Sequence, residues 1–176
     1  MSIETIIVMY AADKLEQYCG RIETCMAKLT PEQIWTRGRD NENAVGNLVL
    51  HLAGNVRQWI LHGVGGEPDH RERDKEFATR ELEVAELKRR LRSTVDEAAA
   101  VIRAVPAERL THRVTIQKYD LTIVEAILHV VEHFSGHTAQ IIFITKFLTG
   151  EDLGFYAHLK STQASASTHA HGEKTP

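Results

Sequence analysis

The sequence has little of what marks secreted, membrane-spanning or nucleic-acid-binding proteins. Its 176 residues include only two cysteines, and no stretch approaches the roughly 18–20 uninterrupted apolar residues that a membrane span requires. No long basic block and no basic patch interleaved with aromatic residues occurs, and the formal net charge is −3 with neutral histidines. These absences argue against a disulfide framework, a membrane span and a nucleic-acid partner.

The two cysteines and the first residues favour a cytoplasmic protein. Cys19 and Cys25 fall on one expected helix, where a rise of about 1.5 Å per residue separates them by roughly 9 Å, too far for a disulfide. The N-terminal segment has no basic region ahead of its short apolar run and no small-residue cleavage site. We therefore expect no signal peptide, and two reduced thiols.

Composition and length favour one soluble globular domain. Apolar residues make up 43% of the chain and charged residues 26%, which is typical of proteins with a single core. The last stretch is small and polar, and it has no aliphatic residue larger than alanine. We expect one folded domain over residues 1–159 and a disordered tail over residues 160–176.

Apolar residues at three- and four-residue spacing predict four long helices, each with one buried face. The predicted ranges are 3–28, 42–62, 80–105 and 122–148. Three polar residues offer caps at the start of the second helix: Asp40, Asn41 and Asn43. Because no convincing sheet accompanies these helices, the sequence predicts an all-α protein, a four-helix bundle.

Two connections are expected to be irregular. The link between the second and third helices is long enough for a crossover, and its run HRERDKE (residues 70–76) mixes both charges, which favours a solvated loop. The alternation in RVTIQKYDLT (residues 113–122) also fits a strand or hairpin arm. Since lone hairpins are weak, we expect an extended connection there.

The fourth helix carries three histidines, His129, His133 and His137, at four-residue spacing. Steps of three and four residues define a mostly apolar stripe on this helix: Ile123, Ile127, Val130, Phe134, His137, Ile141, Ile144 and Leu148. At about 100° per residue, His133 lies roughly 40° to one side of His137, and His129 lies about 40° further round. The predicted burial therefore falls from His137 to His133 to His129.

Histidines four residues apart on a helix share a face and can bind one metal ion, and a catalytic site usually takes a third protein ligand. The best third candidate is His51, which adjoins the apolar face of the second helix, marked by Leu48, Leu52, Val56 and Trp59. Asn47 and Asn55 flank His51 by one turn, and Gln140 follows His137 by one turn. These three amides are candidates for contacting ligands or substrate.

Two other interpretations stay open. Each histidine can instead be a polar residue satisfied inside the core. HVVEH (residues 129–133) also matches the H-x-x-E-H pattern of one metallopeptidase group, with His129 and His133 as ligands and Glu132 as the base. That pairing leaves His137 without a role, and Glu132 is expected to point nearly opposite the apolar stripe.

Three segments together resemble the DinB-like superfamily of small bacterial proteins: NLVLHLAGNVRQWI, GGEPDHRERDKEF and HVVEHFSGHTAQIIFITKFL. The resemblance implies a four-helix bundle, often dimeric, with a divalent metal held by three histidines. Matched position by position, these are His51, His133 and His137. Metals of the family include zinc and nickel, and imidazole ligands suit both.

The resemblance leaves the reaction open. Some relatives transfer low-molecular-weight thiols such as bacillithiol or mycothiol, others are regarded as metal-dependent hydrolases, and many have no known activity. We expect a divalent-metal-dependent thiol transferase acting on an electrophilic small molecule, with a hydrolase as the alternative within enzymes. The alternative outside enzymes is a non-catalytic metal-binding stress or interaction protein. A homodimer is expected, with no nucleic-acid or membrane partner.

Overall fold

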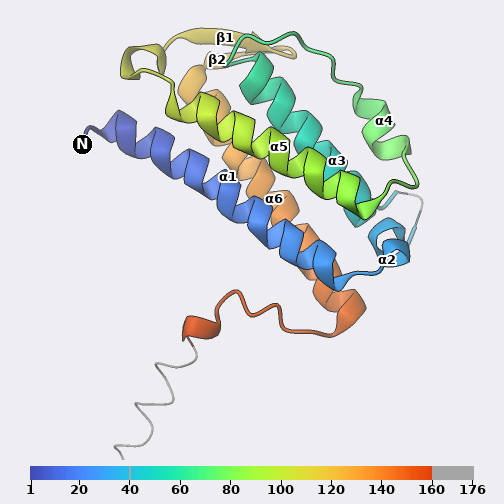
Figure 1. The fold of residues 1–176 in the computed structure, drawn as a ribbon. Helices are drawn as coiled ribbons and strands as arrows, with labels where there is room; N and C mark the ends of the chain where they lie inside the picture. The colour runs from blue at the N-terminus through green and yellow to red at the C-terminus, as the bar shows by residue number, and fades with distance from the viewer. Residues whose placement is uncertain (40, 160–176) are drawn as a thin grey trace, which may run out of the picture.

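A computed structural model describes residues 1–39 and 41–159 (Figure 1). The elements in chain order are α1 (Ile3–Lys28), α2 (Pro31–Trp35), α3 (Val45–Val56), a π-helical continuation of α3 (Arg57–His62), α4 (Arg73–Ala78), α5 (Val84–Arg103), a 3-10 turn (Ala107–Arg109), β1 (Arg113–Ile116), β2 (Tyr119–Thr122) and α6 (Ile123–Thr149). The predicted tail, residues 160–176, lies outside the described residues.

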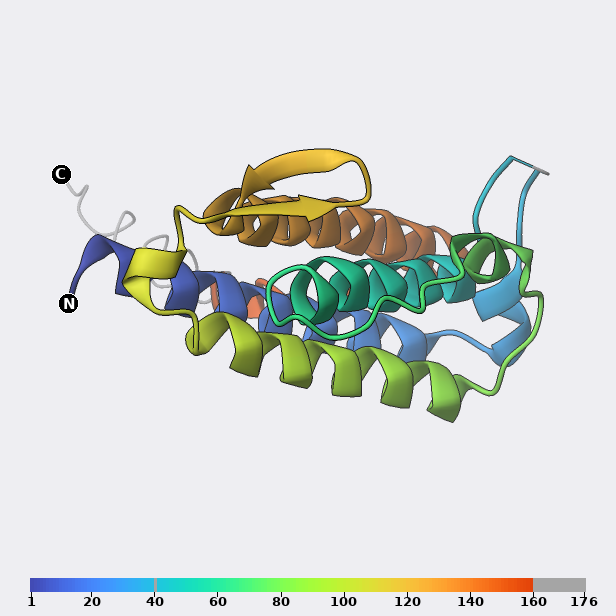
Figure 2. The same cartoon turned by 90° about the horizontal axis from the view of Figure 1, so that it is seen from above.

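Four long helices form the bundle that the sequence predicts. α1 packs against α5 and α6, and α3 packs against the same two helices, so α1 and α3 occupy diagonal corners (Figure 2). The buried side chains of all four helices make one hydrophobic core. Within the described residues, no helix is both long enough and apolar enough to cross a lipid bilayer. The contact between α3 and α6 brings two histidine-bearing faces together.

The ends of α1 and α6 follow from local chemistry. Ser2 caps α1 by accepting a hydrogen bond from the backbone N–H of Thr5. Thr122 and Glu125 form a reciprocal capping box at the start of α6, and Gly150 ends that helix with a left-handed φ of 69°. The predicted range of the first helix is confirmed, and that of the fourth is confirmed to within one residue at each end.

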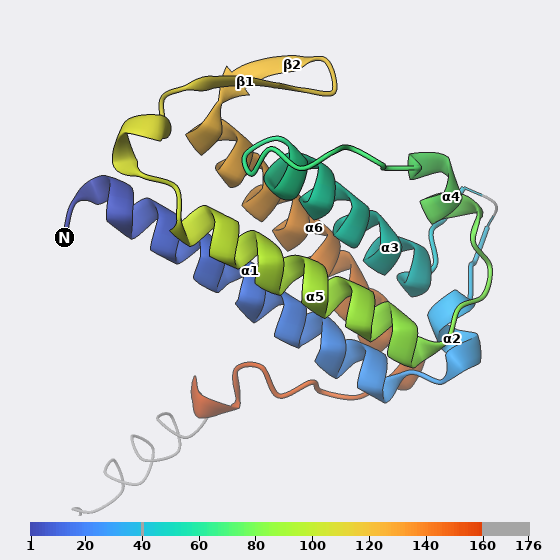
Figure 3. The ribbon, with the colours of Figure 1, turned by 45° about the horizontal axis from the view of Figure 1, so that its top comes forward.

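The expectation for residues 113–122 was wrong. They form an antiparallel hairpin in which Arg113 lies opposite Thr122 and Ile116 lies opposite Tyr119. The hairpin lies over the start of α6 and the end of the α3 region (Figure 3). It is held there because Ile116 is fully buried, so the two strands do not depend on their own hydrogen bonds alone.

The predicted start of the second helix was also wrong. α3 begins at Val45 with Ala44 as its N-cap, and no side chain caps it. Asn41 and Asn43 precede that cap, and Asp40 lies outside the described residues. The connection between α3 and α5 is long, as predicted, but it contains the short helix α4.

The buried face of α6 departs from the predicted stripe at its C-terminal half. Five predicted positions are fully buried: Ile123, Ile127, Val130, Phe134 and Ile141. His137, Ile144 and Leu148 are half-buried, and Thr138 and Thr145 take their place in the core. Both threonine hydroxyls donate to the carbonyl oxygen four residues earlier, at 2.7 and 2.8 Å, which satisfies their donors within the helix.

Candidate metal centre

Three histidines converge between α3 and α6. His51 projects from α3, and His133 and His137 project from successive turns of α6; one potential ligand atom from each lies within 4.8 Å of the others. The Nε2 atoms of His51 and His133 are 3.0 Å apart. Two ligands of a tetrahedral zinc ion at about 2.0–2.1 Å are separated by roughly 3.3 Å. The spacing of these nitrogen atoms therefore fits one divalent ion, and the predicted set of three is brought together.

The helical position of each histidine sets its burial. His51 is 6% exposed because α3 faces the core at this point. His133 and His137 are half-buried, and His129 is exposed. The prediction that His129 is the least buried of the three histidines on α6 is confirmed. His137, predicted to be the most buried, lies at the margin of the core.

Hydrogen bonds on the far side of two rings direct their Nε2 atoms inward. The Nδ1 atom of His51 lies 3.0 Å from Oε2 of Glu76. Nη2 of Arg71 also lies 3.1 Å from this Nδ1 atom, and a guanidinium only donates. With the proton on Nδ1, the ring donates to the Glu76 carboxylate, and its Nε2 atom keeps a lone pair for a metal ion. His137 Nδ1 likewise donates to Oε1 of Gln140 at 2.7 Å. Such outer partners fix the tautomer and orientation of metal-binding histidines.

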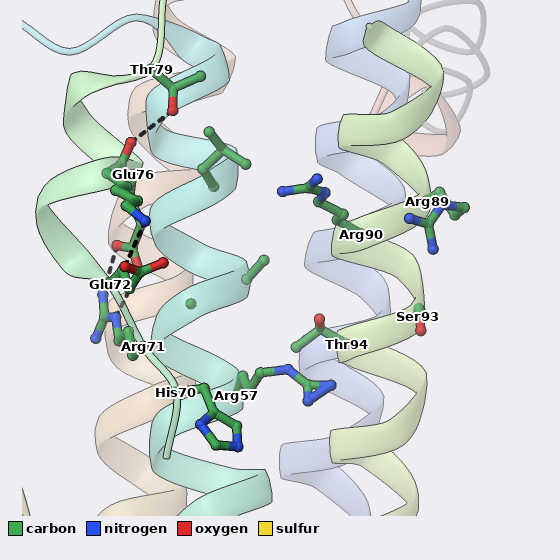
Figure 4. Close-up of a pocket in the computed structure, with 14 residues that line it drawn as sticks. Arg57, His70, Arg71, Glu72, Glu76, Thr79, Arg89, Arg90, Ser93 and Thr94 are labelled. Atoms are coloured by element: carbon green, nitrogen blue, oxygen red, sulfur yellow. Dashed lines mark hydrogen bonds and ion pairs between the residues drawn. The ribbon is translucent and has the colours of Figure 1, made fainter. Parts of the chain in front are cut away.

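A buried ion pair supports His51 from behind. Nε and Nη2 of Arg71 donate to the two carboxylate oxygens of Glu76 at 2.8 and 2.9 Å (Figure 4). The side chains of Arg71 and Glu76 are only 4% and 10% exposed. Burial of the Glu76 carboxyl opposes ionisation, but hydrogen bonds from Arg71 and His51 outweigh it and lower the pKa of Glu76. The carboxylate therefore stays charged beside His51.

This ion pair corrects the expectation of a solvated loop for residues 70–76. Arg71 precedes α4 and Glu76 lies on it, and both pack against α3, where a Cβ on Gly54 would overlap the Glu76 carboxylate. Sequence reasoning missed both residues, because a helix of six residues gives no periodicity. The sequence shows only that an arginine and a glutamate occur in one short charged run, which does not indicate that their side chains are buried.

The two candidate ligands on α6, His133 and His137, are held neutral. Burial lowers the pKa of His133 to about 4, with further lowering from the charges of His137 and His51. Burial also lowers the pKa of His137, against a smaller raising effect of its hydrogen bond to Gln140. Only neutral imidazole offers a lone pair to a metal ion, so both rings are ready to bind at neutral pH.

The three predicted amides have different surroundings. Gln140 supports His137, as described above. Asn47 is fully buried, and its Nδ2 donates to the backbone oxygens of Glu76 and Thr79, both at 2.9 Å, so it anchors the α4 segment to α3. Asn55 is 5% exposed, and among the described residues nothing donates to its buried Oδ1. An orphaned buried acceptor one turn from His51 is consistent with a ligand bound at the histidines.

The competing H-x-x-E-H pairing is not assembled. Glu132 and His129 are both exposed, and within the described chain neither joins the group of three histidines that can hold an ion. The ring of His129 instead lies 4.1 Å from that of Trp59. The geometry therefore supports the set of His51, His133 and His137.

Comparison with known proteins places the fold and the family. The model of a family described as "Protein of unknown function (DUF1572)" matches residues 3–159. The chain belongs to this family. A solved structure entitled "Crystal structure of the conserved protein of locus from Enterococcus faecalis" is similar, with a TM-score of 0.68 and 16% identity over 86% of this chain and 99% of that one. That likeness shows a shared fold for the DUF1572 chain. No curated protein matches it.

Proposed function

We propose that this DUF1572 protein is a divalent-metal-dependent enzyme that transfers a low-molecular-weight thiol to an electrophilic small molecule. Its centre is formed by His51, His133 and His137, and the bound ion is zinc or nickel. The convergence of these three rings is the observation that carries the proposal. The resemblance of the sequence to DinB-like proteins supports the same ligand set and suggests the thiol chemistry.

The donor set suits this chemistry. Three protein ligands leave a coordination position open in a tetrahedral site, and neutral imidazoles leave the charge of the ion uncompensated. A divalent ion supplies the means of lowering a thiol's pKa so that a thiolate forms at neutral pH. Glu76 and Gln140 hold the rings of His51 and His137 in place. In the transfer, a carbon–sulfur bond forms as the bond from that carbon to its leaving group breaks, and the thiol proton leaves to solvent.

The placement of carboxylates favours thiol transfer over hydrolysis. A general base within hydrogen-bond reach of the attacking water assists hydrolysis, in addition to the lowering of the pKa of water by a bound ion. Glu132 is exposed and outside the histidine group, and the Glu76 carboxylate is engaged by Arg71 and His51 on the outer side of a ring. A free thiol has a pKa of about 8.5 and ionises far more readily than water, so thiol transfer at a bound ion would depend less on such a base.

Conjugation assays test this proposal. Zinc- and nickel-loaded protein is mixed with cysteine, glutathione or bacillithiol and the electrophile monobromobimane, and rates are compared with His137→Ala. The expected result is faster conjugation by the loaded wild type with at least one thiol. No acceleration with any thiol contradicts the transferase, and release of p-nitrophenol from an ester in the same preparation favours a hydrolase. Bound metal without either activity favours the non-catalytic protein.

We also propose that the chain forms a homodimer, on the strength of the same resemblance. Sedimentation velocity at several protein concentrations tests this, since a dimer sediments with twice the chain mass. A monomer at every concentration contradicts it.

A further inference from the structure

A groove lies beside the histidine centre, between α6 and the loop that joins α2 to α3. Its volume is about 890 Å³, within the range of small-molecule sites. Its apolar wall is formed by five side chains: Leu48, Phe143, Ile144, Phe147 and Leu148. Phe143 and Phe147 are 69% and 79% exposed, and their rings stack one turn apart. Uncovered apolar surface of this kind indicates a binding surface.

The groove begins one helical turn from two of the three histidines. On α3, Leu48 precedes His51 by three residues, and on α6, Gln140 follows His137 by three residues. Three residues rise roughly 4.5 Å along a helix. The Gln140 side chain connects the groove to the histidine centre, because it lines the groove and accepts a hydrogen bond from His137. The groove is therefore an extension of the metal centre.

One wall of the groove carries the guanidinium of Arg37, for which residues 1–39 and 41–159 provide no counter-ion. Arg37 is half-buried, and its Nη2 donates to Oδ1 of Asn47 at 2.6 Å and to the backbone oxygen of Phe77 at 2.8 Å. Across residues 1–39 and 41–159 no carboxylate pairs with this guanidinium, and its buried Nε has no hydrogen-bond partner. Glu42, also on the groove, is exposed and accepts from the backbone N–H of Arg39.

The positions of these groups give the groove a direction. Arg37 is fixed to Asn47, one turn from His51, and thus sits at the end nearest the metal centre. On α6, Ile144 and Leu148 lie progressively farther from His137. A ligand that pairs with Arg37 and also covers the apolar wall has an anionic head near the histidines and an apolar body that runs toward Leu148.

We propose that this groove binds the substrate as an amphipathic organic acid, with its carboxylate on Arg37 and its apolar body along Ile144, Phe147 and Leu148. The reactive carbon then lies close to the carboxylate, where it faces the histidine centre. This inference deepens the proposed function and rests on it for the reaction, whereas binding of the acid in the groove depends on Arg37 and the apolar wall alone.

Calorimetric titration with a matched pair of probes tests the groove. Octanoate and octanamide have the same chain and a similar planar head, but only octanoate is charged. We expect octanoate to bind the wild type about tenfold or more tightly than octanamide, a difference of about 1.4 kcal/mol, because only the carboxylate carries a charge opposite to that of the guanidinium. Arg37→Met removes the preference, Arg37→Lys retains part of it, and Arg39→Met, which changes an exposed arginine of the same loop, leaves it unchanged.

Changes in the apolar wall give an independent readout. Phe147→Ser weakens octanoate and octanamide by the same factor, and Leu128→Ser, an exposed residue outside the groove, weakens neither. Equal affinity of the two probes for the wild type, or a preference that survives Arg37→Met, overturns the proposal. The proposal is also overturned if the wild type is a dimer that does not bind octanoate and Phe147→Ser is a monomer. A second copy of the chain then fills the groove.

Metal dependence separates this inference from the proposed function. Octanoate binding that persists in EDTA-treated protein, with its dependence on Arg37, supports the groove even where no metal is retained. If octanoate binding is lost after EDTA treatment and is unchanged in Arg37→Met, the carboxylate binds the metal ion and the proposal is overturned. In cobalt-loaded protein, the α-methylene protons of octanoate are expected to broaden more than the terminal methyl protons, and the reverse gradient contradicts the orientation.

Discussion

Removal of the Glu76 carboxylate perturbs both stability and metal binding. In Glu76→Ala, the guanidinium of Arg71, only 4% exposed, loses its carboxylate and keeps its 3.0 Å hydrogen bond to Oε1 of Gln58. Breaking a buried ion pair by deleting one partner costs about 3–5 kcal/mol, against about 0–1 kcal/mol for an exposed pair. We expect the metal-free variant to lose about 3 kcal/mol or more in its free energy of unfolding.

The same change also frees the ring of His51. Loss of an outer partner typically lowers metal affinity about 10–100-fold, which corresponds to about 1.4–2.7 kcal/mol. Glu76→Gln keeps the shape and one acceptor oxygen, so its loss is smaller in both measurements. Glu72→Ala is the matched control, because Glu72 lies in the same segment with its side chain 64% exposed and pairs with Lys75 on the surface.

Two measurements check these magnitudes. Urea denaturation of EDTA-treated protein gives the loss of stability, and competition with a chromophoric chelator gives the affinity for zinc. If Glu76→Ala loses no more stability than Glu72→Ala, the pair of Arg71 and Glu76 is not buried in solution. If its zinc affinity equals that of the wild type, Glu76 does not orient His51.

Three further predictions concern the scaffold. Ile116→Ala empties a fully buried site and should cost about 2–5 kcal/mol in urea denaturation, whereas Tyr119→Ala, at a position 61% exposed, should cost far less; similar losses would contradict the anchoring of the hairpin. Burial raises the pKa of the Cys19 thiol to about 12, so this thiol should react with a disulfide reagent only after denaturation, and rapid native labelling would refute its burial. Hydrogen bonds from Arg103 lower the pKa of Glu16 below 4.5, so Glu16→Gln should lose less than about 1 kcal/mol at neutral pH. Because the folded-state pKa is depressed, that difference is present above about pH 4.5 and fades as pH falls through the folded value; a difference that persists in acid would contradict it.

Local and periodic features of the chain were predictable from sequence. The apolar spacing and caps of α1 and α6 fix most of their ends, and the four-residue spacing on α6 places His133 and His137 on one face. His51 followed from the apolar face of its helix. These inferences succeed because a regular helix converts sequence spacing directly into direction.

Features that depend on tertiary contacts were not predictable. Arg71 and Glu76 are as polar as any surface residue, and only the packing of their segment against α3 buries them. The hairpin exists because Ile116 finds a place in the core, which its four-residue strand does not reveal. Thr138 is buried in the core where His137 was predicted, because the packing of α6 against its neighbours rotates the buried face slightly from the one that the apolar spacing indicates.

Metal content per chain measures whether His51, His133 and His137 bind one ion. Protein with His169 and His171 changed to serine, and no affinity tag, is loaded with zinc or nickel, dialysed and measured by elemental analysis. We expect about one ion per chain in this protein and in His129→Ala, and none in His51→Ala or His137→Ala. Loss of the ion with His129→Ala but not with His137→Ala, or no ion in any form after loading, would contradict it.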